Sequence, residues 1–162
     1  MGLDIAFWIL AVVGVFAALA VVSLRNIFRA ALSLVLCFLT VAGIYITLSA
    51  DFLAAVQILV YVGGISILII LAIMLTRDVS QGNLSNKLRV PAFIVSVLFL
   101  AVLGFALTGT PWAVSTAAPL EPTTAALADK LLGSGGFILP LEIAAVLLLA
   151  AILGAIVLVR EK

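Results

Sequence analysis

The chain of 162 residues contains no histidine, a single cysteine, and only 8 basic and 7 acidic side chains. Haem, iron–sulfur clusters and conventional zinc sites need several histidine or cysteine ligands, so the composition argues against all three. The lone Cys37 lies in an apolar stretch, where we interpret it as a small packing residue. No GxGxxG, GxxxxGK or nucleophile motif occurs in the chain, so we expect no nucleotide site, no covalent catalysis and no nucleic-acid partner.

Hydrophobic residues make up 67% of the chain, far above the share in soluble domains. They form continuous runs, without the alternation of an outer-membrane barrel, and a run of about 20 is enough for a helix to cross a bilayer. The sequence therefore predicts an all-α integral membrane protein with a single membrane domain over residues 1–162. Its five predicted transmembrane helices cover residues 5–24, 30–49, 52–75, 91–108 and 138–159; the third of these is called the third span below.

The basic residues divide unevenly between the two sides of these five helices. Lys130 alone falls on one side, and the opposite side holds Arg25, Arg29, Arg77, Lys87, Arg89, Arg160 and Lys162. Because cytoplasmic loops carry an excess of Lys and Arg, the pattern predicts an outer amino terminus and a cytoplasmic carboxyl terminus. We expect a multi-pass protein of the cytoplasmic (inner) membrane of a prokaryote.

A long outer loop, residues 109–137, precedes the last span. It contains "TTAALADKLLG", which predicts a short surface helix. Thr123 or Thr124 is suited to cap its start, and Gly133 is suited to end it. Tethering of the neighbouring spans is the simplest role for this loop.

Carboxylates inside a membrane are usually retained for function, but the middle of every predicted span lacks one. Asp51 lies at the outer edge of the third span, where capping of that helix explains it. Glu142 follows Pro140, which places it in the predicted first turn of the last helix, where the helix dipole favours an anion. Capping is one role for Glu142, and a polar contact to a neighbouring subunit or a hydrated path is the alternative.

The third span contains the unusual stretch "QILVYVGGISILIILAIML". On a wheel of about 100° per residue, Gln57, Tyr61, Gly64 and Leu68 share one narrow face. Close packing is one interpretation, in which glycine lets another helix approach and the polar side chains bond across the contact. The alternative is a conformational hinge, because adjacent glycines ease formation of a π-bulge, a single wide turn. Both interpretations stay open from these residues.

Two long stretches carry a family resemblance. "VAGIYITLSADFLAAVQILVYVGGISILIILAIML" and, after the outer loop, "LLGSGGFILPLEIAAVLLLAAILGAIVLVR" resemble the J subunit, or chain 6, of the proton-pumping NADH:quinone oxidoreductase, respiratory complex I. "QILVYVG" with its following "ML" pair and "LPLEIA" before "GAIVL" are the most specific parts. By this resemblance Glu142 matches an acid near the outer end of the last helix.

The resemblance implies a non-redox membrane subunit that couples quinone reduction to proton translocation. In this family the third helix carries a π-bulge that interconverts with a regular α-helix. It lies between the quinone-binding arm and the antiporter-like subunits. The matching positions here are Tyr61, Gly63, Gly64, Ile65 and Leu68.

By the same resemblance, FMN, the iron–sulfur clusters and quinone belong to partner subunits, and this chain holds no cofactor and no catalytic centre of its own. The expected partners are the quinone-site subunit, the antiporter-like subunits and lipid. Two alternatives stay open: a subunit of a related multi-subunit cation/proton antiporter, and a purely structural assembly subunit. The electron donor and the quinone are left unassigned.

Overall fold

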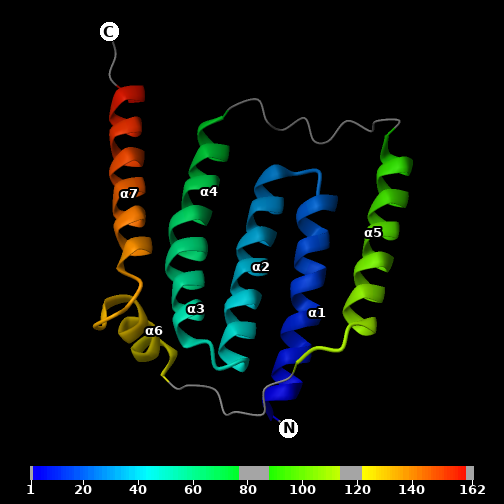
Figure 1. Ribbon diagram of the computed structural model, residues 1–162. Coiled ribbons are helices and arrows are strands. Elements are labelled where there is room, and N and C mark those ends of the chain that lie inside the picture. The colour runs from blue at the N-terminus through cyan, green and yellow to red at the C-terminus, as the bar shows by residue number, and fades with distance from the viewer. Residues whose placement is uncertain (1, 77–87, 114–121, 160–162) are drawn as a thin grey trace.

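The computed structural model describes residues 2–76, 88–113 and 122–159, and its regular elements within these ranges are all helices (Figure 1). The elements are α1 (Gly2–Ser23), α2 (Ile27–Thr47), α3 (Asp51–Val56), the π-helix η1 (Gln57–Ile65), α4 (Ser66–Leu75), α5 (Arg89–Gly109), α6 (Thr123–Leu132) and α7 (Ile138–Val159). Since α3, η1 and α4 follow one another without a break, they form one continuous helix, the third span.

Five of these helices are long and apolar enough to cross a membrane, which confirms the predicted all-α class and the five spans. The third span is the longest, with 25 residues from Asp51 to Leu75. The observed bounds lie within about one helical turn of the bounds expected from the apolar runs. Continuous runs of this kind locate membrane helices well because the bilayer sets their minimum length.

The packed body of the molecule consists of α1, α2 and the third span, which lie side by side (Figure 1). Its interior is built from small side chains, which let helix backbones approach closely in a membrane. The buried residues of the described chain are Ala17, Ala31, Ala42, Ala54, Thr40, Gln57 and Ser66. The last two belong to η1 and α4 and form part of the candidate site.

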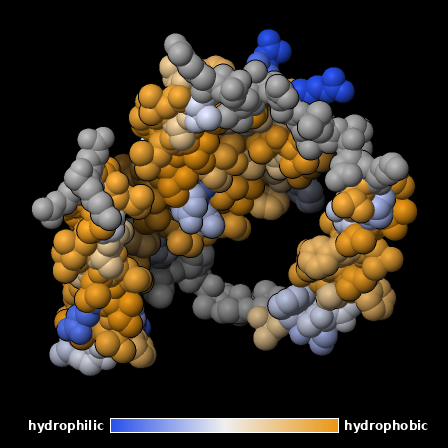
Figure 2. Space-filling view, turned by 90° about the horizontal axis from the view of Figure 1, so that it is seen from above, coloured by the Kyte–Doolittle hydropathy of each residue, from blue (hydrophilic) through white to orange (hydrophobic). Residues whose placement is uncertain are grey.

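Two spans stand apart from this body. Among the described residues, α5 packs against no other helix, and α7 packs only against the short helix α6. Figure 2, which looks along the helices, shows apolar side chains around α5 and an open space between α5 and the packed body. The surfaces of α5 and α7 are therefore left for lipid or for other proteins.

The short helix α6 lies at the same end of the molecule as the amino terminus, beside the starts of α3 and α7 (Figure 1). Gly133 ends it as predicted, with its N–H donating to the Asp129 carbonyl oxygen at 2.9 Å. Its start differs from the prediction, because Pro122 occupies the cap position and Thr123 is already the first helical residue. The Thr123 hydroxyl is engaged with the third span instead.

Candidate functional site in the third span

The winding of the third span changes in its middle. Residues Gln57–Ile65 form a nine-residue π-helix between two α-helical segments. At its end the Ser66 N–H donates to the carbonyl oxygen of Tyr61, five residues back, where an α-helix would use Val62. The irregular segment is thus longer than the single wide turn that the glycine pair suggested.

Ser66 reinforces this winding with its side chain. Its hydroxyl donates to the same Tyr61 carbonyl oxygen at 2.7 Å, and the residue is only 2% exposed. A carbonyl oxygen has two lone pairs, so it can accept both the N–H and the O–H. Ser66 was not among the predicted site residues. The sequence signal for it was its spacing of five residues from Tyr61, which is the spacing of a hydrogen bond in a π-helix.

Helix α2 holds the first part of the π-segment through Phe38. Gln57 is 8% exposed, and its Nε2 donates to the Phe38 carbonyl oxygen at 3.5 Å. A buried amide needs such a partner. The Tyr61 ring meets the Phe38 ring edge-on, with centroids 5.5 Å apart and an interplanar angle of 68°, which is a favourable aromatic geometry.

Among the described residues, the two glycines of the segment have no close neighbour from another helix. A Cβ built on Gly63 would lie 3.4 Å from the carbonyl oxygen of Ile58, and one on Gly64 would lie 3.9 Å from that of Leu59. Both atoms belong to the same helix, and both distances are ordinary van der Waals contacts. Close packing among the described helices therefore does not explain the glycine pair.

The single face expected from the wheel is divided in the structure. Gln57 is buried, whereas Tyr61 is 41% exposed, Leu68 is 66% exposed and Gly64 is also exposed. Ile65 lies between these extremes at 36%. The physical reason is the π-winding itself, since each extra residue in a turn rotates all later residues by about 100° relative to an α-helix.

The acid at the start of the third span does not cap it, contrary to the prediction. Asp51 is the first helical residue, and Ala50 occupies the cap position with no side-chain hydrogen bond. The Asp51 carboxylate instead accepts a hydrogen bond from the Thr123 hydroxyl at 2.8 Å. A cap residue needs a non-helical backbone. In this turn the last non-helical residue is Ala50, so Asp51 lies one position too far along the chain to act as the cap.

Glu142 also lies deeper in its helix than expected. Because α7 begins at Ile138, its first turn contains no acid, and Glu142 is the fifth helical residue. Pro140 does not delay the helix start, since the first four N–H groups of a helix have no intrahelical partner and proline lacks only such a group. The prediction of a first-turn acid is wrong, although Glu142 remains near the amino-terminal end of the span.

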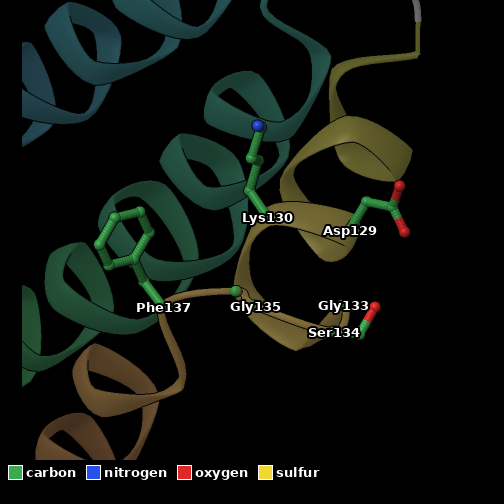
Figure 3. Close-up of a pocket in the computed structure, with 7 residues that line it drawn as sticks. Asp129, Lys130, Gly133, Ser134, Gly135 and Phe137 are labelled. Carbon is green, nitrogen blue, oxygen red and sulfur yellow. The ribbon is translucent and has the colours of Figure 1, made fainter.

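A polar hollow lies in the turn after α6, where Figure 3 shows the side chains of Asp129 and Lys130 pointing in different directions. No set of groups converges there on a ligand. The described residues also contain no group of three or more His, Cys, Asp or Glu side chains that could hold a metal.

Fold and site thus define a multi-pass helical membrane protein with one internally irregular span. Its residues 17–158 match the family model described as NADH-ubiquinone/plastoquinone oxidoreductase chain 6, and the chain belongs to this family. It is 42% identical over 160 residues to NAD(P)H-quinone oxidoreductase chain 6 of Synechocystis sp., covering 97% of this chain and 80% of that protein.

Two further relatives widen the comparison. The chain 6 protein of Leptolyngbya boryana is 39% identical over 162 residues, covering 98% of this chain and 80% of the relative. F(420)H(2) dehydrogenase subunit J of Methanosarcina mazei is 38% identical over 158 residues, covering 96% and 90%. The names chain 6 and subunit J describe single components of multi-subunit oxidoreductases, so other subunits are partners in this family.

Proposed function

We propose that this chain is a non-redox membrane subunit of a proton-translocating quinone oxidoreductase, and that it couples quinone reduction to proton translocation by a change of winding in η1. The observation that carries this proposal is the π-segment itself, which is anchored at its start on Phe38 and closed at its end by Ser66. A π-segment inside an α-helix is uncommon and is often found at functional sites.

The change of winding corresponds to a change in the hydrogen-bond partner of Ser66. In the present state the Ser66 N–H and hydroxyl both bond to Tyr61, whereas an α-helical state pairs the Ser66 N–H with Val62. Each such step turns α4 by about 100° relative to α3. The hydroxyl bond contributes about 0.5–1.5 kcal/mol net, a useful fraction of the few kcal/mol that separate two states of a switching element.

The chemistry of electron transfer is assigned to partner subunits. One cysteine and no histidine are too few ligands for an iron–sulfur cluster. We expect the iron–sulfur clusters, FMN, the quinone site and the catalytic centre in other subunits of the complex. The relatives are named for different donors, NAD(P)H and F(420)H(2). The proposal therefore leaves the donor of this complex unassigned.

The uneven distribution of Lys and Arg residues supports an orientation for the chain in the membrane. The proposed orientation has an outer amino terminus with α6 on the outer side, and a cytoplasmic carboxyl terminus in a prokaryotic cytoplasmic membrane. The detached spans α5 and α7 supply surface for the quinone-site and antiporter-like subunits, with lipid covering the rest. Some relatives are named chloroplastic, so the family is not restricted to one kind of membrane.

The test uses the complex purified from native membranes through a tag on this chain. Its subunits are identified by mass spectrometry, and quinone reduction and proton translocation are measured in proteoliposomes. Recovery of redox subunits supports the oxidoreductase, and recovery of cation/proton antiporter subunits alone supports that alternative.

The coupling role is tested with Ser66→Ala. Loss of the hydroxyl bond to Tyr61 is expected to lower the number of protons moved per electron, the rate of quinone reduction, or both. Ser96→Ala is the matched control, because the Ser96 hydroxyl bonds to the Ala92 carbonyl oxygen at 2.9 Å in the ordinary α-helical manner. If the Ser66→Ala complex assembles fully and keeps its rate of quinone reduction and its number of protons per electron, the chain is better explained as a structural assembly subunit.

A further inference from the structure

The outer end of the third span lacks a cap from its own neighbourhood. Ala50 occupies the cap position and carries no side-chain oxygen. The first N–H groups of a helix have no intrahelical acceptors, so they need partners from elsewhere or from water. This end of the span is therefore open to stabilisation by another element.

That element is α6, which follows 71 residues later in the chain. The Phe52 N–H donates to the hydroxyl oxygen of Thr123 at 3.2 Å. A threonine oxygen that accepts from a first-turn N–H makes the bond of an N-cap, so Thr123 acts as a cap supplied from a distant segment.

The relation is reciprocal. Helix α6 also has no side-chain cap of its own, because Pro122 stands at its cap position. The Thr123 hydroxyl donates to the Asp51 carboxylate at 2.8 Å, which places this carboxylate at the start of α6. A negative charge is favourable at the amino end of a helix, and here it stands at the amino ends of two.

We propose that α6 is a brace for the third span, in which Asp51 and Thr123 act as positioning residues that fix the outer end of that span. This inference rests on the proposed function, since a brace affects coupling only if the third span changes its winding. The role it adds is a specific one for the outer loop, beyond simple tethering.

The brace gives the change of winding a direction. A change in η1 must turn one end of the span relative to the other by about 100° per residue inserted or removed. Among the described helices, α3 packs on both α2 and α6, whereas α4 packs on α2 alone, apart from the η1 segment that both adjoin within the same span. The outer half is the better-anchored one, so the rotation is delivered to α4 and to the opposite end of the span.

The brace is tested in the purified complex with Thr123→Val, which keeps the branched shape and removes the hydroxyl. Hydrogen–deuterium exchange at the start of the third span is expected to become roughly three- to tenfold faster, as for loss of a cap bond. The number of protons moved per electron is expected to fall. Thr123→Ser, which keeps the hydroxyl, should restore both values.

Thr124→Val is the matched control, because Thr124 is the exposed neighbour in the same helix and loses the same group. Unchanged exchange in Thr123→Val, or an equal effect of Thr124→Val, would overturn the brace. Faster exchange with unchanged stoichiometry would overturn the positioning role. In that case the Ser66→Ala variant distinguishes two outcomes. If Ser66→Ala loses coupling, only the brace is wrong; if Ser66→Ala couples normally, the proposed function is wrong as well.

Asp51→Asn is the second variant if Thr123→Val assembles poorly. Its amide oxygen can still accept from the Thr123 hydroxyl, but it removes the negative charge between the two helix ends. Exchange at the start of the third span is expected to rise by about two- to fivefold at low ionic strength, with a smaller rise at high salt. No rise at low ionic strength would overturn the reciprocal part of the brace.

Discussion

Glycine serves different purposes in two regions of this molecule. In the contact between α1 and α2, a Cβ on Gly14 would lie 2.9 Å from Thr40 Oγ1, and one on Gly43 would lie 2.8 Å from a terminal carbon of Leu10. These glycines make room for a neighbouring helix. In η1, among the residues that the structure describes, a Cβ on Gly63 or Gly64 would meet only the carbonyl oxygens of its own helix at ordinary contact distances.

The difference separates packing from backbone conformation. Small residues let membrane helices approach closely, which accounts for the α1–α2 contact. In η1 none of the described helices uses the space, so what glycine contributes there is backbone freedom and a low cost for irregular winding. The comparison makes each region predict a different response to the same substitution.

The largest effect is expected for Gly14→Ala. Its new methyl group would press on Thr40, which is buried and whose hydroxyl donates to the Cys37 carbonyl oxygen at 2.7 Å. Overpacking of this kind costs about 1–3 kcal/mol. We expect a lower thermal midpoint of the complex and a smaller assembled fraction on native gels.

Two controls sharpen that result. Gly14→Ala combined with Thr40→Ala removes the opposing hydroxyl and should recover part of the loss. Gly43→Ala should cost less than Gly14→Ala, because the opposing atoms are at the end of the flexible Leu10 side chain. If Gly14→Ala assembles normally and melts at the wild-type temperature, the α1–α2 contact is looser than described.

A smaller and opposite effect on stability is expected for Gly63→Ala and Gly64→Ala. Alanine gains up to about 1 kcal/mol of helix propensity over glycine, and neither methyl group would meet another of the described helices. The thermal midpoint should stay constant or rise, while quinone reduction or proton translocation falls as regular winding becomes more favourable. Assays of the assembled complex measure both.

The same pair of variants can break the comparison. If Gly64→Ala lowers the assembled fraction as Gly14→Ala is expected to, a helix of a partner subunit must pack against Gly64. The close-packing interpretation would then hold, with the neighbour supplied by another chain. Stability and coupling measured together distinguish the two roles.

Much of the fold could be predicted from the sequence because the bilayer imposes a minimum length and an apolar composition on each span. The five spans and the end of α6 at Gly133 follow from such local signals. The start of α6 and the partner of Asp51 do not, since the bond between Thr123 and Asp51 joins residues 72 positions apart. Distant contacts of this kind leave no local pattern.

The candidate site was predictable only in part for a related reason. The glycine pair and the polar residues of the third span drew attention to it, but the wheel that grouped Gln57 with Leu68 assumed uniform α-helical geometry. A nine-residue π-segment removes that assumption and separates the two residues. It also lets the Ser66 hydroxyl donate to the Tyr61 carbonyl oxygen, a hydrogen bond that is not expected from uniform α-helical geometry.

The smallest effect is expected for Tyr61→Phe, and it tests what the tyrosine contributes to the site. The structure engages Tyr61 through its ring, which meets Phe38, and through its carbonyl oxygen, which accepts from Ser66. Phenylalanine retains both contacts, and the Tyr61 hydroxyl forms no hydrogen bond among the described residues. The free energy of unfolding should therefore change by less than about 0.5 kcal/mol, which is measured as a small shift of the thermal midpoint. Phe38→Leu removes the aromatic pair and should cost about 0.5–1.5 kcal/mol more. Loss of proton translocation in Tyr61→Phe with normal stability would instead assign the hydroxyl a partner, a water molecule or a group of a neighbouring subunit, and would place Tyr61 on a hydrated path.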